Sequence, residues 1–321
     1  MNGRFRLQDV ALRRQQAQRH CGTMASHYEL VDAFPEAREN LATIERFTTQ
    51  FELLGGEESF RVGVAKIPVV VHVVFKTAAE NIPDSQIHNQ IDVLNQDFRA
   101  TNPDAGQVPE PFKHLVADAR IEFALATTDP DGNQTNGITR TQTNVTSFVS
   151  TNNPVKFSAS GGVDAWDTQK YLNIWVCRLA PTATGQLLGY AQFPGNLPAT
   201  DGVVIHHTAF GIGGTAADPF DLGRTATHEV GHYLNLHHIW GDTVVPTCGD
   251  TDKVDDTPNQ FGSNGGKPTF PHISCNNGPN GDMFMNYMDY VDDAAMFMFT
   301  PGQVTRMQAT LAGPRNALIT P

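Results

Sequence analysis

The feature that most constrains this fold is the run THEVGHYLNLHHIWGD at residues 227–242, which holds four histidines and one glutamate. No proline interrupts residues 222–236, and we predict a helix there. At about 100° per residue, His228 and His232 lie on one face of that helix, so both imidazoles can reach one Zn²⁺. Glu229 follows the first histidine and can approach a metal-bound water. The run therefore predicts a metal-binding helix.

A third ligand is needed, and the spacing favours His238. On a continuous helix His238 would point about 240° away from His232 and lie about 9 Å further along the axis. The helix must therefore end and the chain must turn back. Asn235 stands where such a turn is needed, because asparagine and aspartate tolerate positive φ best after glycine. His237 competes for the third position, although the pattern H-E-x-x-H-x-x-G-x-x-H ends at His238. The alternative is that the histidines only decorate a surface helix.

A second signal lies downstream, in NYMDY at residues 286–290. A methionine turn beneath the metal accompanies the long histidine motif. Met288 on its own is as well explained by ordinary core packing. After the long motif, we expect Met288 to support the metal site.

The rest of the chain has the pattern of an α+β domain with a mixed sheet. Residues 1–60 are polar and helical in pattern, and an amphipathic helix capped by Asp84 or Ser85 follows the first strand. Regular structure largely disappears from 241 to 286. The predicted strands are 67–75, 121–126, 171–177, 188–193 and 201–207.

Charge and hydropathy exclude two classes of protein. The formal net charge is −12, from 34 acidic and 22 basic residues, which argues against a nucleic-acid binder. No apolar run approaches the roughly 20 residues that span a bilayer. The amino terminus lacks the apolar segment of a secretory signal.

An ordered set of motifs covers most of the chain and resembles the pappalysin family of metzincin metalloproteases. The motifs are IPVVVHVVF, QIDVLNQDFRATN, NGITRT, YLNIWV, LGYAQFPG, HEVGHYLNLHHIWGD, VDDTPNQ, NYMDY and MFTPGQ. The resemblance implies a metzincin-like catalytic domain with a twisted mixed sheet, an active-site helix and an irregular carboxyl-terminal subdomain. It places a small propeptide at 1–60 and the catalytic domain at 61–321, divided into subdomains 61–238 and 239–321.

The resemblance also implies roles for the motif residues. Glu229 would be the general base of a zinc-dependent endopeptidase, Tyr290 would stabilise the oxyanion, and Met288 would support the metal site. Protein or peptide substrates would lie extended along the strand at 188–193. We expect a monomer. The zinc ligands would be His228, His232 and His238.

The cysteines indicate the compartment and a latency device. A Cys248–Cys275 disulfide would close a loop rich in Asp, Asn, Gly and Pro and stabilise the fold by about 3–4 kcal/mol. It would also indicate an oxidising compartment, and hence a secreted or extracytoplasmic protein. This pair also matches a disulfide of the family. Cys177 lies in an apolar run and is expected to be an inert core thiol. Cys21, in RHCGT, is either a stray thiol or a ligand that closes the zinc site until cleavage near 60–61 releases the propeptide.

Two finer expectations concern specificity and calcium. Relatives often cut before Arg or Lys through an acidic residue whose position here is Ala294. Asp292 or Asp293 would replace that acid, or the preference is relaxed. The acidic loop 248–258 is either solvated or a Ca²⁺ site, with ligands from Asp252 and the Thr257 carbonyl.

Two rival functions remain at this stage. One is a partner-binding protein on a metalloprotease fold with a structural zinc, and the other is a metal-dependent amidase of non-protein substrates. Structural zinc sites are usually closed by four protein ligands. The motif supplies three ligands and a glutamate, which favours the endopeptidase.

Overall fold

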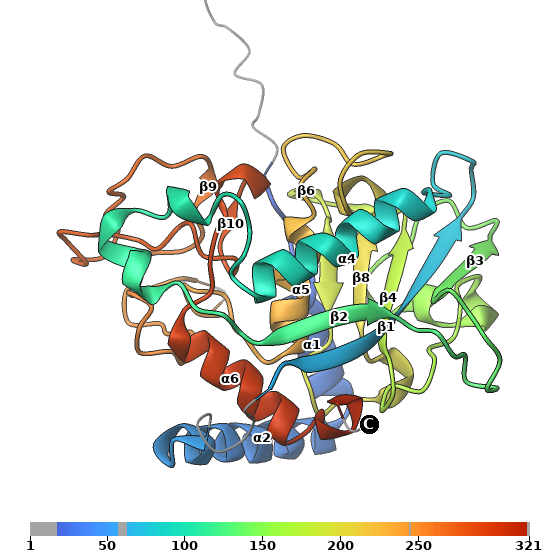
Figure 1. Cartoon of the computed structure of the whole chain (residues 1–321), viewed down its shortest axis with the longest axis horizontal. Helices are drawn as coiled ribbons and strands as arrows, with labels where there is room; N and C mark the ends of the chain where they lie inside the picture. The colour runs from blue at the N-terminus through green and yellow to red at the C-terminus, as the bar shows by residue number, and fades with distance from the viewer. Residues whose placement is uncertain (1–17, 57–62, 244, 320–321) are drawn as a thin grey trace, which may run out of the picture.

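The centre of the molecule is a six-stranded mixed sheet (Figure 1). The computed structural model describes residues 18–56, 63–243 and 245–319. Its strands are β1 (Ala65–Phe75), β2 (Ile121–Leu125), β3 (Ile138–Gln142), β4 (Leu172–Cys177), β7 (Gly189–Ala191) and β8 (Val203–His206). Their order is β2-β1-β4-β8-β7, and β3 pairs with β1 beyond β2. Strand β7 alone runs antiparallel to its neighbour, and it forms one end of the sheet.

Strand β1 shows why the middle of the sheet is stable. Its run IPVVVHVVF is buried almost throughout, as expected for a strand that is covered on both faces. Ile67, Val69, Val71 and Val73 belong to the main core, whereas Val74 packs in a smaller core with Trp175 and Tyr190. The alternation of side chains along β1 therefore joins two apolar layers.

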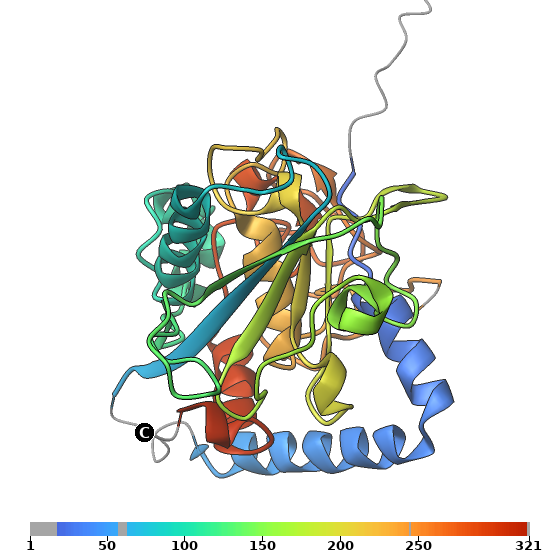
Figure 2. The same ribbon diagram turned by 90° about the vertical axis from the view of Figure 1, so that its right-hand side faces the viewer.

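Five helices surround this sheet in the described part of the chain. They are α1 (Thr23–Ala33), α2 (Pro35–Leu53), α4 (Asp84–Phe98), α5 (Arg224–Tyr233) and α6 (Pro301–Ala312). Helix α4 contacts β2 and α5, and α5 contacts β7 and β8. Helix α2 lies along α6, at the bottom of both views (Figures 1 and 2). None of the described helices is long and apolar enough to cross a membrane.

The carboxyl-terminal region is irregular, as predicted. Between 241 and 289 the described residues contain one short strand, β9 (Gly265–Gly266), which pairs in parallel with β10 (Tyr290–Val291). The predicted disulfide between Cys248 and Cys275 is confirmed. It ties together two ends of a loop that has little other regular structure.

Several details of the sequence-based prediction were wrong. The active-site helix is shorter than 222–236, because Gly223 adopts a φ of +78° before it and Asn235 a φ of +73° after it. Helix α4 begins at Asp84 with no side-chain cap. The carboxylate of Asp84 pairs with Arg140 instead.

Strand β3 and helix α6 are among the elements that were not predicted. Strand β3 is polar and only partly buried, so it lacks an apolar signal. Helix α6 does carry a signal, because Thr300 and Gln303 form a capping box at its start. The expected cleavage point at 60–61 lies outside the described residues, and the division at residues 60 and 238 stays a prediction.

Candidate metal centre

Helix α5 carries the first two histidines and is buried along its whole length. It ends at Tyr233, just before the left-handed turn that the sequence predicted at Asn235. The backbone N–H of Leu236 donates to the Gly231 carbonyl at 3.0 Å, and that of Asn235 donates to the His232 carbonyl at 2.9 Å. With Asn235 in the left-handed region, the chain reverses and carries His238 back towards the helix.

The three imidazoles converge on one point. The Nε2 atom of His232 lies 3.2 Å from that of His228 and 3.1 Å from that of His238. Their Nδ1 atoms face acceptors: the Tyr287 carbonyl at 2.7 Å, the Leu236 carbonyl at 2.7 Å and an Asp242 carboxylate oxygen at 2.8 Å, for His228, His232 and His238 respectively.

This pattern of partners determines what the centre can bind. Because carbonyl and carboxylate oxygens only accept, each Nδ1 carries the proton and each Nε2 presents a lone pair. Burial lowers the pKa of His228 and of His232 well below the ordinary range, so both rings are neutral. Three lone pairs that face one another repel unless a cation lies between them. The donor set therefore fits Zn²⁺.

Cys21 from the amino-terminal segment completes the group. One ligand atom each from Cys21, His228, His232 and His238 lies within 4.8 Å of the others, and the described residues hold no second such cluster. His237 lies outside it. Its ring stacks on Phe193 and its Nδ1 bonds to Asp242.

Glu229 is buried beside this cluster. Its Oε2 accepts from the Thr23 hydroxyl at 2.8 Å and lies 3.4 Å from the Cys21 sulfur. Burial raises the pKa of Glu229 to about 7. Tyr290 also lies beside the cluster, with its hydroxyl 3.1 Å from His238 Nε2. Both predicted catalytic side chains thus lie next to the three imidazoles.

Met288 packs directly beneath the active-site helix. A Cβ on Gly231 would fall 2.5 Å from the Met288 sulfur, so a glycine is needed there. The same turn contributes the Tyr287 carbonyl that orients His228. The methionine turn therefore supports the metal centre in two ways. Met288 packs against α5, and the Tyr287 carbonyl accepts a hydrogen bond from His228.

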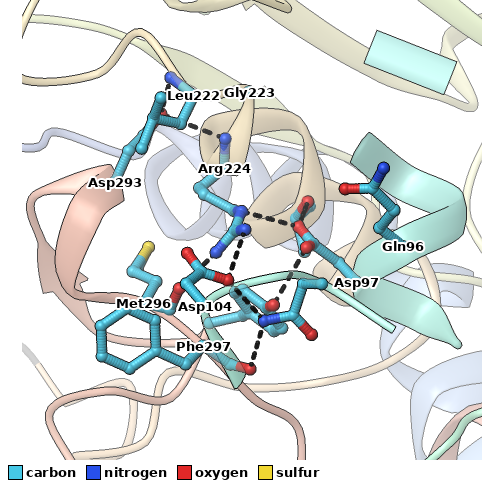
Figure 3. Close-up of polar contacts among 12 residues, drawn as sticks. Gln96, Asp97, Asp104, Leu222, Gly223, Arg224, Asp293, Met296 and Phe297 are labelled. Atoms are coloured by element: carbon cyan, nitrogen blue, oxygen red, sulfur yellow. Dashed lines mark hydrogen bonds and ion pairs between the residues drawn. The ribbon is translucent and has the colours of Figure 1, made fainter. Parts of the chain in front are cut away.

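A buried polar network holds α5 and this turn against α4 (Figure 3). Arg224 lies between two carboxylates, with Nε 3.0 Å from Asp97 and a terminal nitrogen 3.1 Å from Asp104. Asp97 also accepts from Thr227 at 2.6 Å and from the Tyr287 hydroxyl at 3.0 Å. We did not single out these residues from the sequence, where they are separated by long stretches of chain.

Asp242 is another residue that the sequence reasoning missed. It accepts from the Nδ1 atoms of both His237 and His238. Burial raises its pKa, but the two imidazole partners outweigh burial and hold the pKa below the ordinary range. Asp242 ends the motif run, four residues after His238, and that position is the signal that could have found it.

The amino-terminal segment occupies the cleft beside the metal centre. Its residue 20 carbonyl accepts from Leu188 N at 3.0 Å, and Gly22 N donates to the Gly189 carbonyl at 2.8 Å. This segment therefore runs parallel to β7 and covers its free edge. The predicted substrate strand is at the edge of the sheet, and residues 20–22 use its backbone groups.

Arg19 extends from this segment into a closed pocket. It is 1% exposed, and its guanidinium lies 2.5 Å from Asp293, 2.8 Å from the Thr225 hydroxyl and over the Phe220 ring. The second Asp293 oxygen accepts from Leu222 N and Arg224 N (Figure 3). The acid at the base of this pocket is therefore Asp293. Its neighbour Ala294 is exposed.

Within the described residues, the expected calcium ligands belong to no cluster of three or more potential metal-ligating side chains. Asp252 is buried, and its carboxylate accepts from the Thr257 hydroxyl at 2.9 and 3.0 Å. Burial raises the pKa of Asp252 to about 7. The calcium prediction is not supported by a second carboxylate here and stays a prediction.

The left-handed residue in the turn gives a direct test of the local geometry. We expect Asn235→Ala to destabilise the protein by about 1 kcal/mol, since alanine tolerates a φ of +73° less well than asparagine. Asn235→Gly should match or exceed the parent. Thermal unfolding of the three proteins measures this. Equal stability of the Ala and Gly variants would contradict the account.

A mixed sheet, a helix that ends at a turn, three converging histidines and a methionine beneath them define the metzincin class of zinc metalloproteases. Residues 159–312 match the model of the peptidase family described as pregnancy-associated plasma protein-A. An extracellular metalloprotease of Pyricularia oryzae is 31% identical over 300 residues, which cover 91% of this chain and 88% of that protein. The chain belongs to this family, the pappalysins, and is a metalloendopeptidase.

Solved structures agree with this assignment. The chain is similar to a promirolysin variant of Tannerella forsythia, with a TM-score of 0.83 and 47% identity, covering 94% of this chain and 97% of that one. It is also similar to mature mirolysin in complex with a cleaved peptide, with a TM-score of 0.75 and 51% identity, covering 81% of this chain and 100% of that one. The longer match includes the amino-terminal helices, as expected for a zymogen.

Proposed function

We propose that this chain is the latent form of a secreted zinc endopeptidase in which Glu229 is the general base. The observation that carries the proposal is the convergence of three neutral imidazoles next to a buried carboxylate. Zinc held by His228, His232 and His238 would lower the pKa of a water ligand and would polarise the substrate carbonyl. The relatives named extracellular metalloproteases support secretion.

The protein side chains divide the work of hydrolysis. Glu229 accepts the proton of the attacking water and delivers it to the leaving amine. The Tyr290 hydroxyl, which reaches the edge of the imidazole cluster, stabilises the developing oxyanion. Asp242 holds the ring of His238, and the Tyr287 carbonyl holds that of His228, so neither ring has to reorient during the reaction.

Substrates take the place of the amino-terminal segment. The free edge of β7 offers the backbone groups of Leu188 and Gly189, which residues 20–22 use in this latent form. An extended peptide uses the same groups by β-augmentation. The backbone supplies affinity, and side-chain pockets next to the metal supply specificity.

The pocket of Arg19 supports a preference for Arg or Lys after the cut bond. A guanidinium already fits there, with a carboxylate at the base, a hydroxyl on the wall and an aromatic face above. Asp293 thus takes the place of the acid that the family has at the position of Ala294. A neutral side chain would leave the Asp293 oxygen without its partner, which disfavours such substrates.

Cys21 keeps the zymogen inactive by occupying the fourth ligand position, and self-cleavage near 60–61 releases residues 1–60. We expect Cys21→Ser to shorten the time before self-processing begins by about tenfold. A tenfold change in rate corresponds to about 1.4 kcal/mol in activation free energy. Cleavage of the full-length chain over time, followed by electrophoresis, measures this onset. Cys177→Ala, which removes a buried thiol elsewhere, is the control. A Cys21→Ser protein that stays as inert as the parent would show that the thiol has no part in latency.

Calcium binding, a monomeric state and the lack of nucleic-acid binding complete the proposal. Asp252 and the Thr257 carbonyl are the proposed calcium ligands, supported by the burial of that carboxylate, which forms no ion pair among the described residues. The net charge of −12 supports the statement on nucleic acids.

The deciding experiment is to incubate the full-length protein with a mixed peptide library, with and without a zinc chelator. We expect cleavage that stops with the chelator and returns when zinc is restored. Sequencing of the fragments reports the residue after each cut and any self-cleavage site. Zinc binding without cleavage of any peptide would favour a non-catalytic binding protein instead.

A further inference from the structure

Helix α2 is attached to the rest of the molecule at a place separate from the metal centre. It follows α1 and lies along α6 at the bottom of Figures 1 and 2. Its buried side chains are Ala37, Ile44 and Thr48, which share one face at helical spacing. The propeptide therefore has two points of attachment, the cleft segment around Cys21 and this helix.

The second attachment is built on a buried arginine of α6. Arg306 is 1% exposed, and its two terminal nitrogens each lie 3.1 Å from an oxygen of Glu45. Lys253 lies 3.2 Å from the same carboxylate. Burial raises the pKa of Glu45, but the bonds to Arg306 and Lys253 outweigh it and lower the pKa to about 2. Removal of α2 would leave Arg306 without this paired carboxylate.

Close apolar contacts flank this ion pair. A Cβ on Gly195 would fall 2.5 Å from the Ile44 Cδ1 atom, and one on Gly313 would fall 2.7 Å from the Phe47 ring. Asn40 Nδ2 also donates to the Gly195 carbonyl at 3.0 Å. The two glycines thus let the side chains of α2 approach the backbone closely. Helix α2 and the surface beneath it are therefore complementary in charge and in shape.

We propose that Arg306, Lys253, Gly195 and Gly313 form a docking surface for the acidic amphipathic helix 35–53. We further propose that this surface retains the propeptide after the chain is cut within residues 57–62, here called the linker. The inference rests on the proposed release of residues 1–60. While α2 stays bound, it holds the segment around Cys21 at a high effective concentration near the metal centre. That segment therefore rebinds faster than it diffuses away. A single cut therefore leaves the protein latent, and activation requires α2 to dissociate.

The test uses the full chain with Glu229→Gln, so that the protein does not cut itself. A recognition site for a sequence-specific protease is inserted between residues 56 and 63, and the added protease makes the cut. After the cut, gel filtration at micromolar concentration reports whether the fragment stays bound. We expect co-elution, and we expect it to persist when Cys21→Ser is added. A fragment that separates as soon as the linker is cut, or that is released by Cys21→Ser alone, would overturn the proposal.

Charge variants on one helix supply the matched controls. Glu45→Lys should speed dissociation about a hundredfold, because it puts a positive charge against Arg306 and Lys253. Glu39→Lys makes the same charge change at an exposed position of α2 and should leave the rate unchanged. Arg306→Glu combined with Glu45→Lys should restore retention. Equal effects of the two single lysine variants would contradict a docking surface at Arg306. None of these readouts depends on hydrolysis, so failure of the proposed function would be seen separately.

Discussion

Replacing Glu229 by glutamine is expected to lower kcat by about 10³-fold while zinc stays bound. Glutamine keeps the shape of the side chain but cannot accept and return the proton of the attacking water. The carboxylate is not among the converging ligand atoms, so the three imidazoles remain in place. Rates on a fluorogenic peptide, after removal of residues 1–60 by an added protease, measure the loss. Zinc content per chain is measured on the same sample.

A matched change elsewhere separates chemistry from stability. Glu122→Gln removes a carboxylate that pairs with Arg99, far along the sheet on β2, and should leave kcat unchanged. The full-length Glu229→Gln protein should also remain uncut on storage. Activity within tenfold of the parent, with zinc at one per chain, would show that Glu229 is not the general base.

Replacing Asp293 by asparagine is expected to lower kcat/KM by about 10²-fold or more for peptides with arginine after the cut. The estimate follows from the cost of leaving a buried guanidinium without its carboxylate. Asparagine keeps an oxygen for the Leu222 and Arg224 amides, so the start of α5 should hold. Paired peptides that differ only in Arg or Leu after the cut measure the loss as a ratio.

Asp292 offers the control, since it is adjacent and makes no hydrogen bond to Arg19 within the described residues. Asp292→Asn should lower the ratio for Arg over Leu much less than Asp293→Asn does, because Asp292 interacts with Arg19 only through its charge. If Asp293→Asn lowered the rates on both peptides equally, its role would be to hold the helix start. The basic preference would then have another origin.

The site was predictable in the parts where its geometry is local. Helical periodicity is enough to place His228 and His232 on one face, because four residues make about one turn. The turn after the helix was also predictable, since Asn235 is one of the few residues that tolerate the observed φ of +73°. The mixed sheet was predictable from the apolar strands, although polar β3 was missed.

The remaining parts depend on residues that are distant in the sequence. Arg19 and Asp293 are 274 positions apart, and no local pattern indicates that one fills the pocket of the other. The sequence left Asp292 and Asp293 as alternatives, because the two side chains are chemically identical. They differ only in the direction in which the backbone points each carboxylate. Backbone pairing at β10 and the turn that follows it decide which carboxylate faces the pocket.

By itself the sequence determined the zinc-binding pattern, the turn that completes it and the class of fold, because each depends on short-range periodicity or on the φ that one residue tolerates. Only the tertiary structure decided which acid meets the arginine, which carboxylate holds His238 and where helix α2 packs. Those contacts join segments whose encounter is set by the packing of the whole core, and no single segment encodes it.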